Sequence, residues 1–137
     1  MEKMIRIGGK DCRLKTSAAL PRLYRQILGR DIFKDVGSIL YLFGSEQEGE
    51  TDTVKLEIVA DEGSPEQIRG LNFIEDLTYI MHKHGDPAQP DTVEAWLEQF
   101  DDAGAVFEVV ADVLGLWFAE NAQTSVSEKK TGKSTGK

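Results

Sequence analysis

The sequence predicts an α+β fold that is mostly α, in which an N-terminal β-hairpin packs on four to five helices. Two short alternating runs flank a Gly-Gly pair near the N-terminus, a pattern typical of a hairpin. Farther along, apolar residues recur at spacings of three and four, as on one face of a helix. The 137 residues and the hydrophobic fraction of 40% suit one domain with one core, which we expect to span residues 1–121.

The predicted hairpin joins residues 4–7 to residues 12–15 through Gly8 and Gly9. Glycine adopts positive φ without steric cost, which a tight turn between two strands requires. A hairpin alone is marginal in water, so we expect other elements to cover it. Residues 54–59 (VKLEIV) also alternate, and they are predicted as a third strand that would help to stabilise the hairpin. The alternative is that this segment begins a helix.

The first helix is expected at residues 18–28. Thr16 or Ser17 is the predicted N-cap, because a hydroxyl at this position accepts a hydrogen bond from an unpaired backbone N–H. Pro21 fits only the first turn of a helix, and Gly29 is a typical stop.

Two longer helices follow, one from residue 31 to about residue 43 and one from Ser64 to near Gly85. The second has a strong start: Ser64 at the N-cap, Pro65 at the first position, and Gln67 three residues after the serine. The predicted inward faces comprise Ile32, Phe33, Val36, Ile39, Leu40 and Phe43 in the first helix, and Ile68, Leu71, Ile74, Leu77, Thr78 and Met81 in the second.

Two further helices are expected after the break at residues 86–90 (DPAQP). Asp91 is the predicted N-cap of the first, and Glu94 completes a capping box. The last helix is predicted at about residues 103–121. The inward residues are expected to be Val93, Trp96, Leu97, Phe100, Val106, Val110, Val113, Leu114 and Trp117, with Phe107 and Phe118 alongside.

Charge is distributed unevenly along the chain. Residues 1–40 carry nine Lys/Arg against four Asp/Glu, a net +5, whereas residues 41–121 carry three against nineteen, a net −16. Residues 122–137 are rich in Lys, Gly and Ser and carry a net +3; without apolar periodicity they are expected to form a disordered tail. Such asymmetry favours association with an oppositely charged partner or a second copy, as a homo-oligomer. The alternative is that the acidic residues only maintain solubility.

Composition argues against several classes of protein. The net charge of −8 disfavours general nucleic-acid binding, which requires a basic surface. No run of eighteen apolar residues predicts a membrane span, and the start MEKMIRIGGK contains no apolar stretch typical of a secretory signal. Cys12 is the only cysteine, so no internal disulfide forms. It is expected to pack on the hairpin or to lie at its edge, and the alternative is a nucleophilic thiol whose pKa Lys10 and Arg13 would lower. We therefore expect an intracellular protein in a reducing compartment.

No pattern predicts a catalytic, cofactor or metal site, so we expect a protein that is not an enzyme. Residues 131–134 (TGKS) look like part of a phosphate-binding loop, but a serine occupies the position of the required glycine. His82 and His84 are two apart, and metal sites on helices need spacings of three or four. Adjacent acids such as Glu75 and Asp76 are expected on different faces of a helix, without forming an acid/base couple.

The candidate partner-binding residues lie near the C-terminal helix. Phe107, Trp117 and Phe118 make its apolar face wide. Core packing is the leading interpretation of this face, and the alternative is that part of it stays exposed for a partner. The acidic pair Asp101 and Asp102 precedes this helix and is included in the candidate surface.

The order of these features resembles the tail assembly chaperones of long-tailed bacteriophages and prophages, particularly those of Gram-positive hosts. The matching segments are IRIGGKDCRLKTSAALPRLYRQILGRDIF, LNFIEDLTYIMHKHGDPAQPDTVEAWLEQFDD, and the final helix that ends in Leu116-Trp117 before a short Ser/Lys tail. Together they cover about two-thirds of the chain. The stretch 44–63 departs from the family, because it is longer and more strand-like.

The resemblance implies a role in the cytoplasm of the bacterial host. Such proteins bind the long, helical tape-measure protein and help to recruit the tail-tube subunits, the major tail protein, around it. Many are made in two forms by ribosomal frameshifting, with which the end KKTGKSTGK is compatible. The alternative function is a small acidic regulator that binds a basic nucleic-acid-handling protein.

Overall fold

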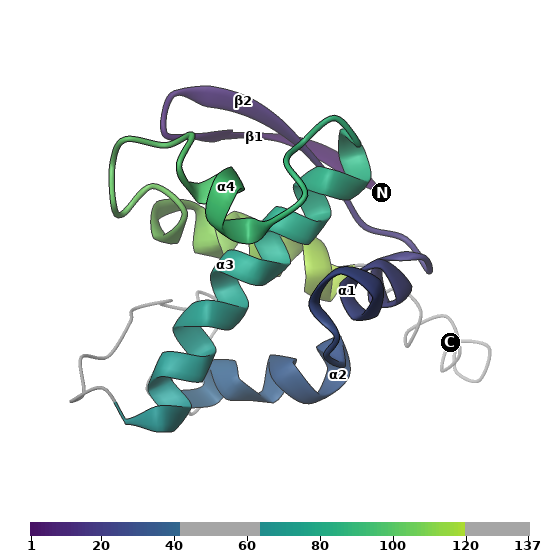
Figure 1. Ribbon diagram of the computed structural model, residues 1–137, viewed down its shortest axis with the longest axis vertical. Helices are drawn as coiled ribbons and strands as arrows, with labels where there is room; N and C mark the ends of the chain where they lie inside the picture. The colour runs from purple at the N-terminus through teal and green to yellow at the C-terminus, as the bar shows by residue number, and fades with distance from the viewer. Residues whose placement is uncertain (42–63, 120–137) are drawn as a thin grey trace, which may run out of the picture.

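A computed structural model describes residues 1–41 and 64–119 of the chain (Figure 1). The predicted class is confirmed: an antiparallel hairpin is followed by helices. The predicted strand at 54–59 and the predicted tail at 122–137 lie outside the described residues. The elements are β1 (Glu2–Ile7), β2 (Lys10–Lys15), α1 (Leu20–Leu28), α2 (Ile32–Asp35), the 3-10 helix η1 (Val36–Tyr41), α3 (Pro65–Gly85), α4 (Val93–Leu97), the 3-10 helix η2 (Phe107–Val109) and a final helix at 110–119.

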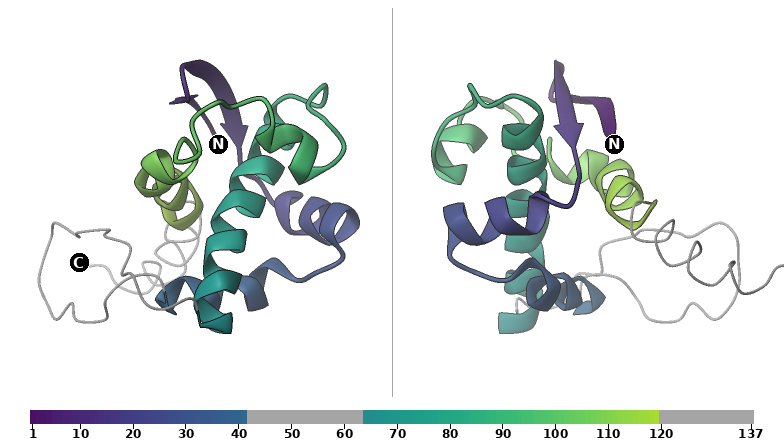
Figure 2. Two further views of the ribbon diagram at one scale, coloured as in Figure 1. Left: turned by 60° about the vertical axis from the view of Figure 1, so that its left-hand side comes forward. Right: turned by 90° about the vertical axis from the view of Figure 1, so that its right-hand side faces the viewer.

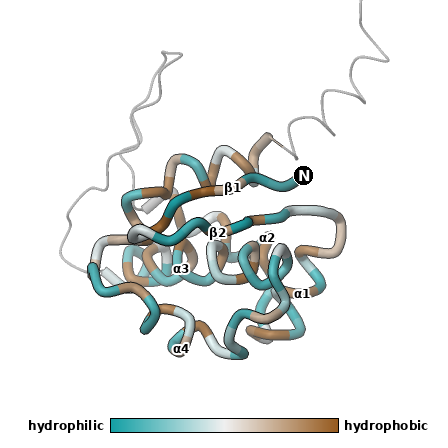
Figure 3. The backbone as a smooth tube through the Cα atoms, turned by 90° about the horizontal axis from the view of Figure 1, so that it is seen from above, coloured by the Kyte–Doolittle hydropathy of each residue, from teal (hydrophilic) through white to brown (hydrophobic). Residues whose placement is uncertain are grey.

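The hairpin forms as predicted. Gly8 and Gly9 have φ of 56° and 85°, which permits the two-residue turn between β1 and β2. Ile5 faces Cys12 across the strands. Hydrophobic and hydrophilic residues alternate along both strands (Figure 3). One face of the hairpin is therefore buried, and it consists of Ile5, Ile7, Cys12 and Leu14.

The helix α3 is the central element, and the other elements pack around it (Figure 2). Its start is confirmed: the Ser64 side chain accepts a hydrogen bond from the backbone N–H of Gln67 at 3.1 Å. The helix ends at Gly85, where a Cβ atom would overlap the carbonyl oxygen of Arg13 in β2, so glycine lets helix and strand approach closely. The prediction that Ile68 faces inward is wrong, because its side chain is exposed.

The start of α1 differs from the prediction. The helix begins at Leu20, and its N-cap is Ala19, which makes no side-chain capping bond. The Ser17 hydroxyl instead accepts a hydrogen bond from the Ala19 backbone N–H at 3.1 Å, in a turn before the helix. Gly29 ends α1 in the left-handed conformation, with φ of 73°, as predicted.

The helix predicted from residue 31 to about 43 is in fact a short α2 followed by η1. Gly37 has poor helix propensity, and the Ser38 hydroxyl donates to the Asp35 carbonyl oxygen at 2.6 Å, which favours the tighter turn. The predicted inward face is wrong at Phe33: α2 turns the preceding residue, Ile32, into the core and leaves the Phe33 side chain 56% exposed. Ile32 and Ile39 are buried as predicted.

The last two helices begin later than predicted. Thr92, and not Asp91, caps α4: its hydroxyl accepts from the Ala95 backbone N–H at 3.1 Å. Asp91 pairs with Lys83 instead, at 3.0 Å. The final α-helix begins at residue 110, because turns and η2 occupy residues 103–109.

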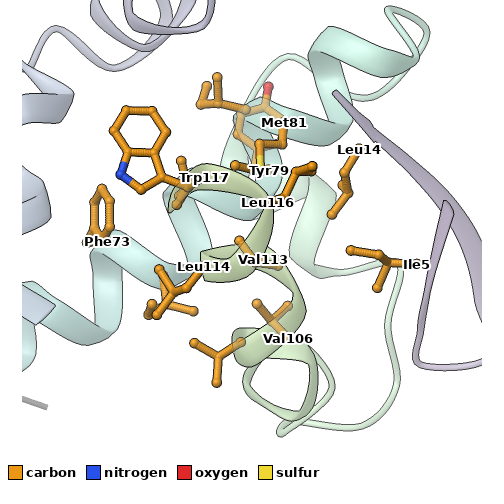
Figure 4. Close-up of a cluster of buried hydrophobic side chains, with 14 of the residues drawn as sticks. Ile5, Leu14, Phe73, Tyr79, Met81, Val106, Val113, Leu114, Leu116 and Trp117 are labelled. Carbon is orange, nitrogen blue, oxygen red and sulfur yellow. The ribbon is translucent and has the colours of Figure 1, made fainter. Parts of the chain in front are cut away.

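The final helix completes the core. In Figure 4 its apolar side chains lie among residues of the hairpin, such as Ile5 and Leu14, and residues of α3, such as Phe73. The residues predicted to face inward in this part of the chain are largely confirmed. Those that are buried are Trp96, Val106, Val110, Val113, Leu114 and Trp117.

Candidate functional site

A cleft of about 610 Å³ opens where α1 ends, beside the middle of α3 and the start of α4. We call it the α1–α3–α4 cleft. Its apolar lining comes from α1 and α4, and its acidic lining comes mainly from α3 and the start of α4. The apolar residues are Ile27, Leu28, Val93 and Leu97, and the acidic residues are Asp35, Glu75, Asp76, Asp91 and Glu94.

Arg30 connects the walls of the cleft. Gly29 turns the chain at the end of α1, so that Arg30 leaves the helix and reaches both α2 and α3. Its Nε donates to Asp35 Oδ2 at 2.9 Å, and its Nη2 donates to Asp76 Oδ2. Tyr24 donates its hydroxyl hydrogen to the same Asp35 oxygen at 2.6 Å, while the guanidinium carbon lies 5.7 Å from the centre of the tyrosine ring. This network fixes α1 and α2 against α3.

The network leaves negative charge in the cleft. Two carboxylates, Asp35 and Asp76, share the single guanidinium of Arg30, and the Asp76 side chain is only 9% exposed. Burial raises the pKa of Asp76 above its ordinary range, and Arg30 opposes that rise. The nearby carboxylate of Glu94 also raises the pKa of Asp76. The charges of these residues therefore act on one another across the cleft.

Glu75 adds to this surplus. It is half-buried, and burial and the charge of Asp76 both raise its pKa. Among the described residues, neither Glu75 nor Glu94 has a side-chain hydrogen bond or an ion pair. The cleft thus has five carboxylates against the guanidiniums of Arg30 and Arg69, and one of the five, Asp91, is also paired with Lys83. The remaining excess of negative charge favours a cationic ligand.

Sequence reasoning did not find this site. The adjacent acids Glu75 and Asp76 are expected on different faces of a helix, yet both line the same cleft. The cleft is wide enough to span two neighbouring directions around α3. The sequence does show a local excess of acidic residues in α3 and at the start of α4. It does not show which of these residues line a common cleft.

The residues predicted to bind a partner do not line the cleft. Asp101 and Asp102 are exposed, and Asp102 accepts a hydrogen bond from the Gly104 backbone N–H at 3.0 Å. Phe107 is half-buried. Trp117 is 5% exposed and packs in the core, whereas Phe118 is 47% exposed.

The Trp117 ring stacks at a tilt on Phe33, with ring centroids 5.9 Å apart. The exposed Phe33 in α2 therefore lies beside the final helix, which the sequence did not indicate. Whether Phe118 contacts a partner stays a prediction.

The two histidines have separate partners, as their spacing indicated. His82 is buried, and its Nδ1 accepts a hydrogen bond from Trp96 Nε1 at 2.9 Å. Burial lowers the pKa of His82, which favours the neutral ring in the folded protein. His84 Nε2 lies 2.8 Å from the Ser17 hydroxyl oxygen. In the described ranges, no group of three or more His, Cys, Asp or Glu side chains is arranged to hold a metal ion.

Cys12 is fully buried on the inner face of the hairpin, where burial raises the pKa of its thiol. A protonated, inaccessible thiol does not act as a nucleophile. It is therefore a core residue in this fold.

Comparison with known proteins gives no relatives: no protein-family model, curated protein or solved structure matches the chain. Among residues 1–41 and 64–119, no helix is both long enough and apolar enough to cross a membrane.

Proposed function

We propose that this protein is a non-enzymatic binding protein whose ligand is another protein. The observation that carries the proposal is the α1–α3–α4 cleft, which combines apolar side chains with two carboxylates, Glu75 and Glu94, that form no ion pair among the described residues. Pockets for small molecules are lined predominantly by apolar and aromatic residues. Seven of the thirteen residues that line this cleft are charged, which fits charge complementarity with a partner protein better.

The lining residues also supply little for catalysis. Their one hydroxyl, that of Thr92, caps α4. The half-buried carboxylate of Asp35 and the buried one of Asp76 are held by Arg30. The lining contains no Ser, Cys, His, Lys or Tyr side chain, so Thr92 and the carboxylates are its only groups of a nucleophilic type.

We further propose that the binding role is that of a phage tail assembly chaperone. In this role the protein binds the helical tape-measure protein and recruits tail-tube subunits in the host cytoplasm. Support comes from the sequence resemblance over the hairpin, α1, α3 and α4, and from the acidic surplus of residues 41–121, which suits a partner with basic segments.

The test is co-purification with the tape-measure protein that a neighbouring, much longer reading frame should encode. We expect a complex at low ionic strength that weakens toward about 1 M salt, where the Debye length falls to about 3 Å. The tail-tube subunit alone and an unrelated basic protein serve as controls. Absence of a complex with the tape-measure protein at low salt would refute the tail-assembly role. Capture of a basic nucleic-acid-handling protein in its place would favour the regulatory alternative.

A further inference from the structure

The α1–α3–α4 cleft presents two kinds of surface side by side. Leu28 at the end of α1 and Val93 and Leu97 in α4 supply apolar contact area. Glu75 in α3 and Glu94 in α4 supply carboxylates that no described side chain pairs. A ligand that satisfies both surfaces must itself be amphipathic.

The net charge of the cleft determines the sign of the charge that its ligand should carry. The group formed by Asp35, Arg30 and Asp76 keeps one net negative charge, because two carboxylates share one cation. The unpaired charges of Glu75 and Glu94 add two more, and Arg69 in the lining offsets one, so the cleft stays negative. Like charges at a partly buried site repel one another, so a bound cation would relieve repulsion as well as gain attraction.

We propose that the cleft binds a segment of a partner protein in which a lysine or arginine lies next to apolar side chains, as along one edge of an amphipathic helix. The cation faces Glu75 and Glu94, and the apolar side chains contact Leu28, Val93 and Leu97. Helical segments place such residues three or four positions apart on one face, so a single turn presents both. This inference rests on the proposed protein-binding function and adds the chemistry of the partner.

The tail of the chain is a less suitable occupant. Residues 122–137 carry a net charge of +3, but Val126 is their only aliphatic residue other than alanine. The tail could therefore satisfy the acidic wall and not the apolar one.

The probe is a synthetic amphipathic peptide of leucine and lysine, labelled for fluorescence anisotropy, and its counterpart in which glutamate replaces every lysine. The cleft variant is Glu75→Gln with Glu94→Gln, which removes two charges without breaking a hydrogen bond of the described structure. The matched control is Glu98→Gln with Glu108→Gln, two exposed acids that do not line the cleft and form no ion pair among the described residues. All are made in the full chain.

We expect the leucine-lysine peptide to bind the wild type, and the glutamate peptide not to bind. The cleft variant should bind the lysine peptide about tenfold more weakly, because each screened ion pair contributes up to about a factor of five. The control should change affinity less than about twofold. Equal weakening in the cleft and control variants, or equal binding of both peptides, would overturn the inference.

Two further outcomes separate this inference from the proposed function. A complex with the tape-measure protein that survives unchanged in the cleft variant would overturn the cleft as its binding site and leave the tail-assembly role standing. Failure of the wild type to bind the tape-measure protein, with the peptide result as expected, would refute the tail-assembly role and support the cleft. Replacement of the four tail lysines by glutamine tests the chain's own tail as the occupant. If this replacement tightens peptide binding in the protein with the wild-type cleft and not in the cleft variant, the tail occupies the cleft and the inference is overturned.

Discussion

Replacing Trp96 with phenylalanine should destabilise the fold strongly, because the indole has two roles in the interior. Trp96 is 0% exposed, and its ring packs against Tyr79 and Phe100, with centroid separations of 5.6 and 5.1 Å. Its Nε1 donates to His82 Nδ1 at 2.9 Å, which is the hydrogen bond that joins α4 to α3. Phenylalanine keeps the aromatic packing in part and loses the donor.

The magnitude follows from these two losses. An acceptor left unsatisfied in the interior costs about 1–3 kcal/mol, here at His82 Nδ1. The smaller ring leaves a cavity that adds on the order of 1 kcal/mol. We therefore expect Trp96→Phe to lower the free energy of unfolding by about 2–4 kcal/mol, which corresponds to a fall in Tm of roughly 10 °C for a domain of this size.

Urea unfolding followed by far-ultraviolet circular dichroism measures this change, with an unchanged m-value as evidence that the transition remains two-state. The double variant Trp96→Phe with His82→Leu is the control, because removal of both partners leaves no unsatisfied polar atom. The two substitutions should be coupled by about 1 kcal/mol. A loss below about 0.5 kcal/mol in Trp96→Phe would show that the hydrogen bond and the packing contribute little, and the reasoning would be wrong.

Three other predictions concern pH, backbone contacts and assembly. Burial lowers the pKa of His82 from 6.5, so as pH falls the unfolded chain takes up the proton before the folded protein does. The stability advantage of the wild type over His82→Gln should therefore be full above pH 6.5 and shrink as pH falls below it. Thermal unfolding at several pH values measures this change. Gly85→Ala should lower the free energy of unfolding by about 1–3 kcal/mol, because the new Cβ overlaps the Arg13 carbonyl oxygen. Gly115→Ala lies on an open helix surface and should raise that free energy by about 0.5–1 kcal/mol in the same urea assay. Light scattering across a salt series should show oligomers that dissociate as salt rises, and a monomer at every salt concentration would refute self-association.

Helix ends that depend on local chemistry alone were predicted correctly, such as the cap at Ser64 and the stop at Gly29. Where two neighbouring residues could both cap a helix, the prediction was wrong at Asp91. That carboxylate pairs with Lys83 at 3.0 Å, which leaves Thr92 to cap α4. The choice depends on a side chain eight positions away, at the far side of a loop, and no local pattern reports it.

The sequence by itself determined the hairpin, the apolar faces of the main helices and the acidic surplus of residues 41–121, because periodicity, turn glycines and charge are local properties of the chain. Only the tertiary structure decided which acids of that surplus meet. Arg30 and Asp76 are 46 positions apart, and Glu75 and Glu94 line one cleft only through the packing of α4 on α3. That packing is the sum of many weak contacts between distant segments. The charge of the sequence therefore indicates a positively charged partner, and the fold indicates the cleft in which that partner would bind.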